Sequence, residues 1–226
     1  MSARAPVRLA VFDCDGTLSD GQAAVCNAMV AAFASRELTA PDLHQVRRMV
    51  GLSLPQAMRQ LAPAESAESQ MALVEAYKHA FRAARADGSL HEPLFPGMAD
   101  LVRALHAEGW TLAVATGKSD RGLASTLEVN GLLNLFSSLQ TADRHPSKPH
   151  PAMLEACLAE TMAEPGNTLV IGDTVYDMEM AKSAGVGALG VAWGYHEADE
   201  LLAAGASAVA NDAQALRELI YVQINH

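Results

Sequence analysis

Two carboxylates one residue apart follow a short apolar segment near the start of the chain. Residues 7–12 are mostly apolar, as in a strand buried on both faces, and Asp13 and Asp15 come directly after them. Side chains at i and i+2 share a face or converge in a turn, and close carboxylates repel unless a cation or proton intervenes. Because open α/β sheets bind ligands beyond the carboxyl ends of their strands, these aspartates are candidate site residues. On local sequence alone, a pair of turn-forming aspartates before Gly16 fits equally well.

Three later segments also place polar or charged side chains at the ends of apolar stretches or before a helix. Thr116 and Gly117 end a second apolar stretch, where a hydroxyl group and backbone N–H groups can hold a phosphate, although Thr-Gly is also an ordinary turn. Lys148 lies in a proline-rich segment that restricts the backbone, and its ammonium group suits a phosphate. Asp173 and Asp177 follow a third apolar stretch. They fit either a cation site or a helix N-cap with an acidic first turn.

Taken in order, these segments resemble the motifs of the haloacid dehalogenase-like superfamily. Residues 13–18 read Asp-Cys-Asp-Gly-Thr-Leu, which matches the opening motif Asp-Xaa-Asp-Gly-Thr-Leu. Thr116, Lys148 and Asp173 match the three motifs that follow. One such match is a weak signal, whereas four in the right order are a specific one. The resemblance implies an enzyme that transfers a phosphoryl group.

The resemblance also implies a role for each acidic residue. Asp13 is expected to attack phosphorus and form an aspartyl-phosphate, and Asp15 to act as general acid and base. Mg²⁺ is the expected cofactor, because a cation that keeps water and touches phosphate prefers oxygen ligands. Its expected ligands are Asp13, Asp15 through the backbone carbonyl group, and Asp173. Asp177 is expected to be a further ligand or an anchor behind the metal.

The remaining pattern predicts an α/β fold with an inserted helical segment. From about residue 21 to 87, apolar residues recur at helical spacing, and prolines divide the segment into about four helices. From residue 92 onward, helical segments alternate with short strands, which is typical of a mainly parallel sheet covered on both faces. We therefore predict a Rossmann-like α/β core at 1–20 and 92–226, with an α-helical cap domain at 21–91. The predicted strands lie at residues 7–12, 111–115, about 137–141, 168–172, 187–191 and about 207–210.

The composition argues against several other classes of protein. The 226 residues are 50% hydrophobic, enough for a sizeable core, and the formal charge of −10 disfavours a surface for nucleic acid or anionic membrane. The 3 cysteines lack paired or metal-type spacing, no apolar stretch reaches transmembrane length, and no signal-like segment precedes the first strand. We therefore expect a cytoplasmic protein that acts on a small phosphorylated metabolite, with no nucleic-acid or membrane partner. The sequence does not indicate an oligomeric state.

Within the superfamily, the chain resembles phosphoglycolate phosphatase-like members with a helical cap. Haloacid dehalogenases do not need the second acid, Asp15, and the one cap lysine, Lys78, lies in mid-helix rather than in a loop as expected for a phosphonatase. Arg48 and Ser53 are the cap residues expected to face the pocket and select the substrate, the alternative being solvated side chains. Lys118 is expected to be an ordinary solvated lysine.

Other functions also fit this sequence. A pyrophosphatase and a sugar-phosphate mutase use the same scaffold, and a mutase is recognised by slow net hydrolysis and a need for a bisphosphate activator. A catalytically idle binding module is the third alternative, and the intact set of acidic, hydroxyl and lysine residues argues against it. We predict a Mg²⁺-dependent phosphatase that acts on a small, phosphoglycolate-like phosphomonoester.

Overall fold

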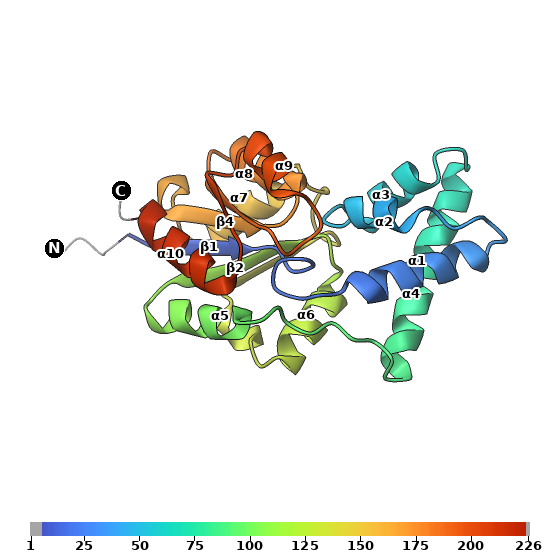
Figure 1. Ribbon diagram of the computed structural model, residues 1–226, viewed down its shortest axis with the longest axis horizontal. Coiled ribbons are helices and arrows are strands. Elements are labelled where there is room, and N and C mark those ends of the chain that lie inside the picture. Colours follow the sequence, from blue (N-terminus) through green and yellow to red (C-terminus); the bar gives the residue numbers. More distant parts are fainter. Residues whose placement is uncertain (1–5, 225–226) are drawn as a thin grey trace.

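The structure, a computed structural model, describes residues 6–224 and is built around one parallel sheet (Figure 1). The sheet has 6 strands, and every neighbouring pair is parallel. Its strands are β1 (Leu9–Phe12), β2 (Thr111–Thr116), β3 (Ser138–Thr141), β4 (Thr168–Gly172), β5 (Gly187–Val191) and β6 (Ala208–Ala210). All six lie within two residues of the positions predicted from the sequence.

Helices cover both faces of the sheet, and a further group of helices lies beyond the carboxyl ends of its strands (Figure 1). The further group consists of α1 (Gln22–Ala34), α2 (Leu43–Arg48), α3 (Leu54–Leu61) and α4 (Ala67–Ala86). The covering helices are α5 (Met98–Ala107), α6 (Asp120–Val129), α7 (Ala152–Thr161), α8 (Val175–Ser183), α9 (Ala198–Ala204) and α10 (Ala213–Ile224). Two short 3-10 helices, η1 (Leu133–Leu135) and η2 (Pro165–Asn167), complete the described elements.

Strand β1 is buried on both of its faces. Leu9 and Val11 point into an apolar cluster shared with α7 and α8, whereas Ala10 and Phe12 point into a second cluster shared with α5, α6 and α10. All four side chains are 0% exposed. A strand covered on both faces needs a continuous apolar sequence, which explains why residues 7–12 lack the alternation of a half-exposed strand.

The strand order brings the carboxyl ends of β1, β2 and β4 together. The sheet runs β3-β2-β1-β4-β5-β6, so the chain builds outward from β1 in one direction and then crosses to its other side. Val11 of β1 pairs with Ala113 of β2 on one side and with Val170 of β4 on the other. Such a reversal point is where parallel sheets bind ligands. The residues that follow these three strands therefore share one crevice.

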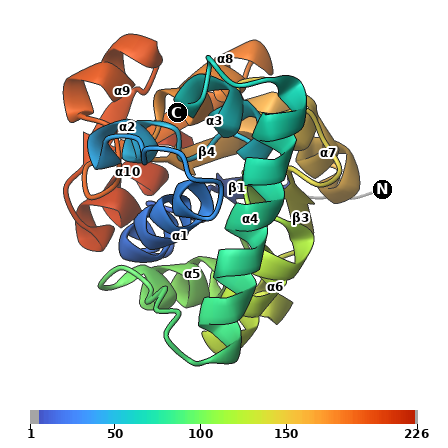
Figure 2. The same cartoon turned by 90° about the vertical axis from the view of Figure 1, so that its right-hand side faces the viewer.

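Helices α1–α4 form a layer with an apolar core of its own (Figures 1 and 2). Met29 of α1, Met58 of α3 and Leu73 of α4 belong to one buried cluster. Helix α4, with 20 residues, is the longest of the described helices. The predicted fold class, a Rossmann-like parallel core with an inserted α-helical cap, is confirmed. The bounds of the cap at 21–91 stay a prediction.

The two segments that join the cap to the core run side by side. The N–H of Asp20 donates to the carbonyl oxygen of Pro93 at 2.8 Å, and the N–H of Phe95 donates to that of Leu18 at 3.0 Å. Entry to the cap and return from it are therefore hydrogen-bonded to each other.

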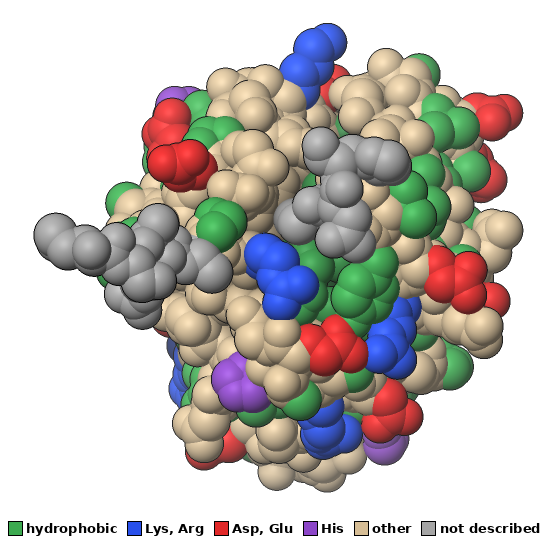
Figure 3. Space-filling model, turned by 90° about the vertical axis from the view of Figure 1, so that its left-hand side faces the viewer, with side chains coloured by type: hydrophobic (Ala, Val, Ile, Leu, Met, Phe, Trp, Pro, Cys, Tyr) green, Lys and Arg blue, Asp and Glu red, His purple; other side chains and the backbone are tan. Residues whose placement is uncertain are grey.

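On the face away from the cap, acidic and basic side chains are interspersed (Figure 3). An exposed ion pair of the core joins Arg217 to Glu108 at 2.6 Å, and pairs of this kind contribute about 0–1 kcal/mol. Among residues 6–224, no helix combines the length and the apolar character needed to cross a membrane.

The cap touches the end of the sheet at a glycine that leaves no room for a side chain. A Cβ atom at Gly117 would lie 2.6 Å from the carbonyl oxygen of Leu52 and 2.9 Å from that of Gly51.

We predict that Gly117→Ala moves this part of the cap away and breaks the 2.7 Å hydrogen bond from the Ser53 N–H to the Ser147 hydroxyl group. Hydrogen exchange at the Ser53 amide should accelerate by about tenfold or more, as measured by NMR.

Gly166→Ala is the matched control, because nothing lies within 4 Å of the position its Cβ would take. Exchange at Ser53 should match the wild type in this control. Equal exchange rates in the two variants would show that the glycine contact does not hold the cap.

Candidate active site

Asp13 stands at the end of β1, where the sheet fixes its backbone. Its N–H donates to the carbonyl oxygen of Ile171 in β4 at 2.9 Å, so the carboxylate emerges between two central strands. Its Oδ1 accepts a hydrogen bond from Nζ of Lys148 at 2.8 Å. Its Oδ2 is buried and has no hydrogen-bond partner among the described residues. A buried carboxylate oxygen without a hydrogen-bond partner is unfavourable unless a ligand supplies the missing interaction.

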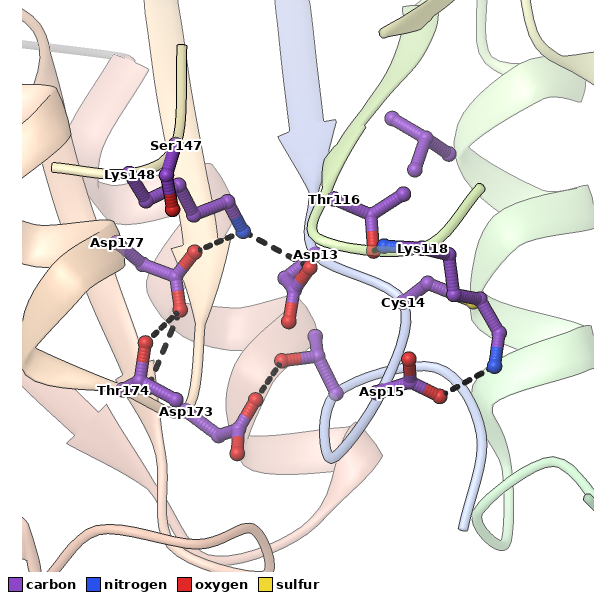
Figure 4. Close-up of polar contacts among 12 residues, drawn as sticks. Asp13, Cys14, Asp15, Thr116, Lys118, Ser147, Lys148, Asp173, Thr174 and Asp177 are labelled. Atoms are coloured by element: carbon purple, nitrogen blue, oxygen red, sulfur yellow. Dashed lines mark hydrogen bonds and ion pairs between the residues drawn. The ribbon is translucent and has the colours of Figure 1, made fainter. Parts of the chain in front are cut away.

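Asp173 directly follows β4 and lies close to Asp13 (Figure 4). Its Oδ1 accepts from the hydroxyl group of Thr17 at 2.7 Å, and its Oδ2 accepts from the N–H of Tyr195 at 2.9 Å. These two hydrogen bonds fix the orientation of the carboxylate. The N-cap of α8 is the next residue, so helix capping does not account for Asp173.

Asp177, in the first turn of α8, binds in two directions. Its Oδ2 accepts from the hydroxyl group of Thr174 at 2.7 Å and from the N–H of Thr174 at 3.2 Å, which closes a capping box. Its Oδ1 accepts from Nζ of Lys148 at 2.5 Å. The helix start therefore holds Asp177, and Asp177 in turn holds the lysine.

Three carboxylates thus share one buried place with one ammonium group. An oxygen atom from each of Asp13, Asp173 and Asp177 lies within 4.8 Å of the others, and all three side chains are buried. Lys148, which is 0% exposed, is the only cation bonded to them in the described part of the chain. When all the carboxylates are ionised, two negative charges are left without a counter-charge.

Burial and repulsion between carboxylates both disfavour the ionised forms of Asp13 and Asp173. Burial, together with the charge of Asp177, outweighs the attraction of Lys148 and raises the pKa of Asp13 to about 7. The pKa of Asp173 lies well above its usual range because of burial and then the charges of Asp13 and Asp177. Burial opposes the charged form of Lys148, but Asp13 and Asp177 outweigh it and raise the pKa of that ammonium group. A divalent cation would remove this conflict.

The donor set fits such a cation. Carboxylate oxygens are the ligands that Mg²⁺ prefers, and the unpartnered Oδ2 of Asp13 offers a free ligand atom. The structure brings the predicted ligands Asp13 and Asp173 together, with Asp177 beside them. The carboxylate of Asp15 binds Lys118 instead of joining this cluster (Figure 4), and a metal contact by its backbone carbonyl group stays a prediction.

Asp15 is held by a buried lysine. Nζ of Lys118 lies 2.6 Å from Oδ1 of Asp15 and 2.6 Å from Oε1 of Glu92, in the segment that returns from the cap. The Lys118 side chain is only 9% exposed, so the prediction of a solvated lysine is wrong. Burial lowers the pKa of Lys118, but the charges of Asp15 and Glu92, with the other groups around it, together outweigh burial, and the pKa is raised. Lys118 therefore connects the candidate acid to the cap junction.

Thr116 ends β2 and Gly117 follows it, and both line the same cavity as Asp13 and Asp15. The Thr116 hydroxyl group accepts from the N–H of Lys118 at 3.3 Å (Figure 4). The structure thus brings these residues to the carboxylates, as the predicted phosphate site requires. Their contact with a phosphate stays a prediction.

The cavity lies between the sheet and the cap and has a volume of about 430 Å³. Sites for small molecules typically measure about 300–1,000 Å³. The core lines it with the two acids of the first motif and with the end of β2, and α1–α4 line it from the other side. Gly51 and Leu52, which directly precede Ser53 in the cap, are part of this lining.

Arg48 and Ser53, the cap residues predicted to select the substrate, are not among the described residues that line this cavity. The guanidinium group of Arg48 binds Glu200 in α9 through hydrogen bonds of 2.5 and 2.8 Å, which lower the pKa of Glu200 to about 2. The carbonyl oxygen of Arg48 accepts from the Tyr176 hydroxyl group at 3.2 Å. Arg48 therefore joins the cap to the core, and the expectation that it faces the pocket is wrong. Ser53 also bridges to the core, through its N–H and Ser147.

Two loops close tightly around Asp173, and glycines make this approach feasible. Gly16 has φ 87°, and a Cβ atom there would lie 2.2 Å from Oδ2 of Asp173. A Cβ atom at Gly194 would lie 2.2 Å from Cβ of Asp173. Tyr195, whose N–H binds Asp173, follows in the loop after β5. Sequence reasoning missed this loop, although its place after a strand of the sheet was an available signal.

Comparison with known proteins identifies the family of the chain. The family model for haloacid dehalogenase-like hydrolases matches residues 10–191. The chain is 36% identical over 203 residues to a protein of Dickeya dadantii named probable phosphatase IndB, covering 87% of this chain and 86% of that one. It is 27% identical over 226 residues to a phosphoglycolate phosphatase of Vibrio vulnificus, covering 96% and 97%. A hydrolase structure from Pseudomonas syringae has the same fold, with a TM-score of 0.84 and 24% identity over 95% of this chain and 98% of that one.

The chain therefore belongs to the haloacid dehalogenase-like hydrolases. The resemblance inferred from the four sequence motifs is confirmed, and so is the prediction of an enzyme.

The raised carboxylate pKa values predict that Mg²⁺ binding depends on pH. Below about pH 7 Asp13 carries a proton in the metal-free protein, and a cation must displace it. The apparent affinity for Mg²⁺ should therefore fall as the pH is lowered from 8 to 6, by up to about tenfold per pH unit for each proton displaced. Isothermal titration calorimetry in two buffers of different ionisation enthalpy measures both the affinity and the number of protons released.

The control for this titration is Asp100→Asn, whose side chain in the wild type is 93% exposed. It should bind Mg²⁺ as the wild type does, whereas Asp173→Asn should lose binding. An affinity that stays constant between pH 6 and 8 would contradict the protonated state of the cluster.

Lys118 is the counter-charge for two largely buried carboxylates. Its removal leaves Asp15 and Glu92 without a counter-charge in a largely buried place, so Lys118→Met should lower the free energy of unfolding by about 3 kcal/mol. Adding Glu92→Gln should recover part of the loss, because one of the two carboxylates is then neutral. Urea unfolding followed by circular dichroism measures both effects.

Lys182→Met is the control, because Lys182 is exposed and its loss should change stability by no more than about 0.5 kcal/mol. If the Lys118 and Lys182 variants had the same free energy of unfolding, the buried ion pairs of Lys118 would not contribute to stability.

Proposed function

We propose that this hydrolase is a Mg²⁺-dependent phosphatase that acts on a small organic phosphomonoester, phosphoglycolate-like in kind, through an aspartyl-phosphate at Asp13. The observation that carries the proposal is the buried, unpartnered Oδ2 of Asp13, beside Lys148 and next to an open cavity. The names of the relatives, a phosphatase and a phosphoglycolate phosphatase, support the same class.

Asp13 supplies the nucleophile in this proposal. Lys148 contacts only one of its two oxygen atoms, so lone pairs remain for phosphorus and for a cation. A carboxylate oxygen attacks phosphorus, a P–O bond to Asp13 forms, and the bond to the leaving alcohol oxygen breaks. Water then attacks the same phosphorus, which releases inorganic phosphate and restores the carboxylate.

The phosphate group of the substrate needs positive charge and fixed donors around it. Lys148 supplies a buried ammonium group that Asp177 holds in position at 2.5 Å. Thr116 and Gly117 supply a hydroxyl group and a backbone N–H at the end of β2. When held by Asp13, Asp173 and the backbone carbonyl group of Asp15, Mg²⁺ supplies the charge that neutralises phosphate oxygens.

Asp15 is the group placed to move protons. Its carboxylate lines the cavity, and Lys118 holds it at 2.6 Å. In the first step it protonates the leaving oxygen, and in the second it accepts a proton from the attacking water. Because Lys118 also binds Glu92, the position of this carboxylate depends on the segment that returns from the cap.

In the proposal, residues 1–20 and 92–226 carry the chemistry and the cap at 21–91 covers it. Side chains from both parts line the cavity. A cap in this place excludes water from the site and contacts the part of the substrate that does not react.

The proposal predicts that Asp13→Asn abolishes phosphatase activity while the protein stays folded. The substitution removes the attacking oxygen with little change in volume, so kcat should fall by at least about a thousandfold. Release of inorganic phosphate from p-nitrophenyl phosphate and from phosphoglycolate, with Mg²⁺ present, measures the loss. Asp100→Asn, at an exposed site, should keep full activity.

Activity of the Asp13 variant within about tenfold of the wild type, a barrier change of only about 1.4 kcal/mol, would remove the nucleophile from the proposal. If the wild type kept full activity in excess chelator, the proposed requirement for Mg²⁺ would be wrong.

A further inference from the structure

Apolar side chains line most of the cap side of the cavity. Met29 of α1, Leu54 of α3, and Tyr77 and Phe81 of α4 are among them. The rings of Tyr77 and Phe81 lie on adjacent turns of α4, with their centroids 5.1 Å apart. Covering such a wall removes apolar surface from water, which is favourable by about 25 cal/mol for each Å². A ligand made only of charged groups would leave this apolar surface in contact with water.

Basic side chains form a row on the same wall. Lys78, Arg82 and Arg85 all line the cavity and follow one another at i, i+4 and i+7 along α4, so they share one face of that helix. Figure 2 shows α4 lying across the end of the sheet. Lys118 and Arg121 also line the cavity. Lys118 is paired with Asp15 and Glu92, whereas Arg121, in the first turn of α6, forms no ion pair with a described residue.

Acidic neighbours compensate the row only in part. Glu75 lies 3.0 Å from Lys78 and 4.0 Å from Arg82, on an exposed turn of α4. Glu92 lies 3.9 Å from Arg85, which is too far for a strong hydrogen bond. Most of the N–H donors of these guanidinium groups are therefore free to meet an anion.

The charge of this wall is opposite to that of the whole chain, which carries −10. Beyond Asp13 and Asp15, Asp143 is the only acidic residue in the described lining, and its Oδ2 accepts from the N–H of Asp120 at 2.9 Å. The cavity therefore combines the candidate phosphate site at Asp13, in the core, with the basic row and the apolar side chains on the cap.

We propose that the preferred substrate is a phosphomonoester with an apolar, ring-sized body and a second anionic group. The inference rests on the proposed function, because it assumes that the phosphate reacts at Asp13. It replaces the phosphoglycolate-like substrate of that proposal with a larger one that shares the second anionic group of phosphoglycolate. The apolar body packs on the wall that includes Tyr77 and Phe81. The second anionic group meets Lys78 and Arg82.

A substrate as small as phosphoglycolate uses this cavity poorly. It carries a second anionic group but no apolar body, so Phe81 and its neighbours stay in contact with water. Binding energy from the non-reacting part of a substrate is what raises its kcat/KM above that of a truncated analogue.

Three synthetic substrates separate the contributions of the body and of the second anion. Ethyl phosphate and benzyl phosphate have leaving alcohols of similar strength and differ in the body. The third, 4-carboxybenzyl phosphate, adds the anion, and its methyl ester is the neutral control. We expect kcat/KM to rise by about a hundredfold from ethyl to benzyl phosphate and by about a further tenfold from the ester to the carboxylate. Phosphoglycolate should rank below 4-carboxybenzyl phosphate.

The salt dependence of the wild type tests the charge directly. The advantage of the carboxylate over its ester should shrink as ionic strength rises from about 0.01 M to 1 M, because Lys78 and Arg82 are exposed and salt screens their charges. The difference between benzyl and ethyl phosphate should persist, since apolar contact is not screened.

A double variant tests whether Lys78 and Arg82 cause the preference for the carboxylate substrate over its ester. Lys78→Gln combined with Arg82→Gln should lower the preference for carboxylate over ester by about fivefold or more. The matched control combines Arg36→Gln and Arg59→Gln, which remove the same charge from exposed cap residues outside the lining, and its preference should equal that of the wild type.

The outcomes separate this inference from the function on which it rests. Hydrolysis of p-nitrophenyl phosphate with no preference for benzyl over ethyl phosphate, or for the carboxylate over its ester, would overturn the substrate class and leave the phosphatase intact. A higher kcat/KM for phosphoglycolate than for 4-carboxybenzyl phosphate would do the same. Failure to release phosphate from any of these compounds would overturn both.

Discussion

The rest of the site depends on the burial of three carboxylates with a single ammonium group. Asp13, Asp173 and Asp177 are close enough to repel one another, and Lys148 compensates only one of their charges. Such an arrangement costs several kcal/mol unless further positive charge enters it. The fold maintains it through backbone and hydroxyl donors that hold each carboxylate, and through loops that approach Asp173 where glycine leaves room. In the proposed function, a divalent cation would relieve this unfavourable charge, and a phosphate group would bind beside the cation and Lys148.

Much of the fold, and this part of the site, could be predicted because each depends on local sequence. The apolar stretch before Asp13 is continuous, since β1 is covered on both faces, and the alternation of helices and strands after residue 92 implies parallel pairing. Parallel strands all end at one edge, so polar residues that follow β1, β2 and β4 meet without any knowledge of the packing. Asp13, Thr116 and Asp173 are of this kind. Lys148 was placed by its resemblance to a motif, and the structure buries it between Asp13 and Asp177.

The residues that escaped prediction depend on how the cap sits on the core, which local patterns do not encode. Lys118 looked like a solvated lysine, yet it is buried between Asp15 and Glu92, residues far from it in the sequence. Its position two residues after a strand end was the one local indication. Arg48 was expected in the pocket, but its partner Glu200 lies on a helix at the other end of the chain. The basic and aromatic residues of α4 read as an ordinary amphipathic helix until the cap places them over Asp13.

The steric course of the reaction at phosphorus tests the central claim, that Asp13 carries the phosphoryl group, most directly. A phosphomonoester made chiral at phosphorus with sulfur and oxygen isotopes is hydrolysed in isotopically labelled water, and the configuration of the product is determined. Attack by Asp13 followed by attack of water inverts the configuration twice, so the account predicts net retention. Net inversion would mean that water displaces the alcohol in a single step, and Asp13 would then not be the nucleophile.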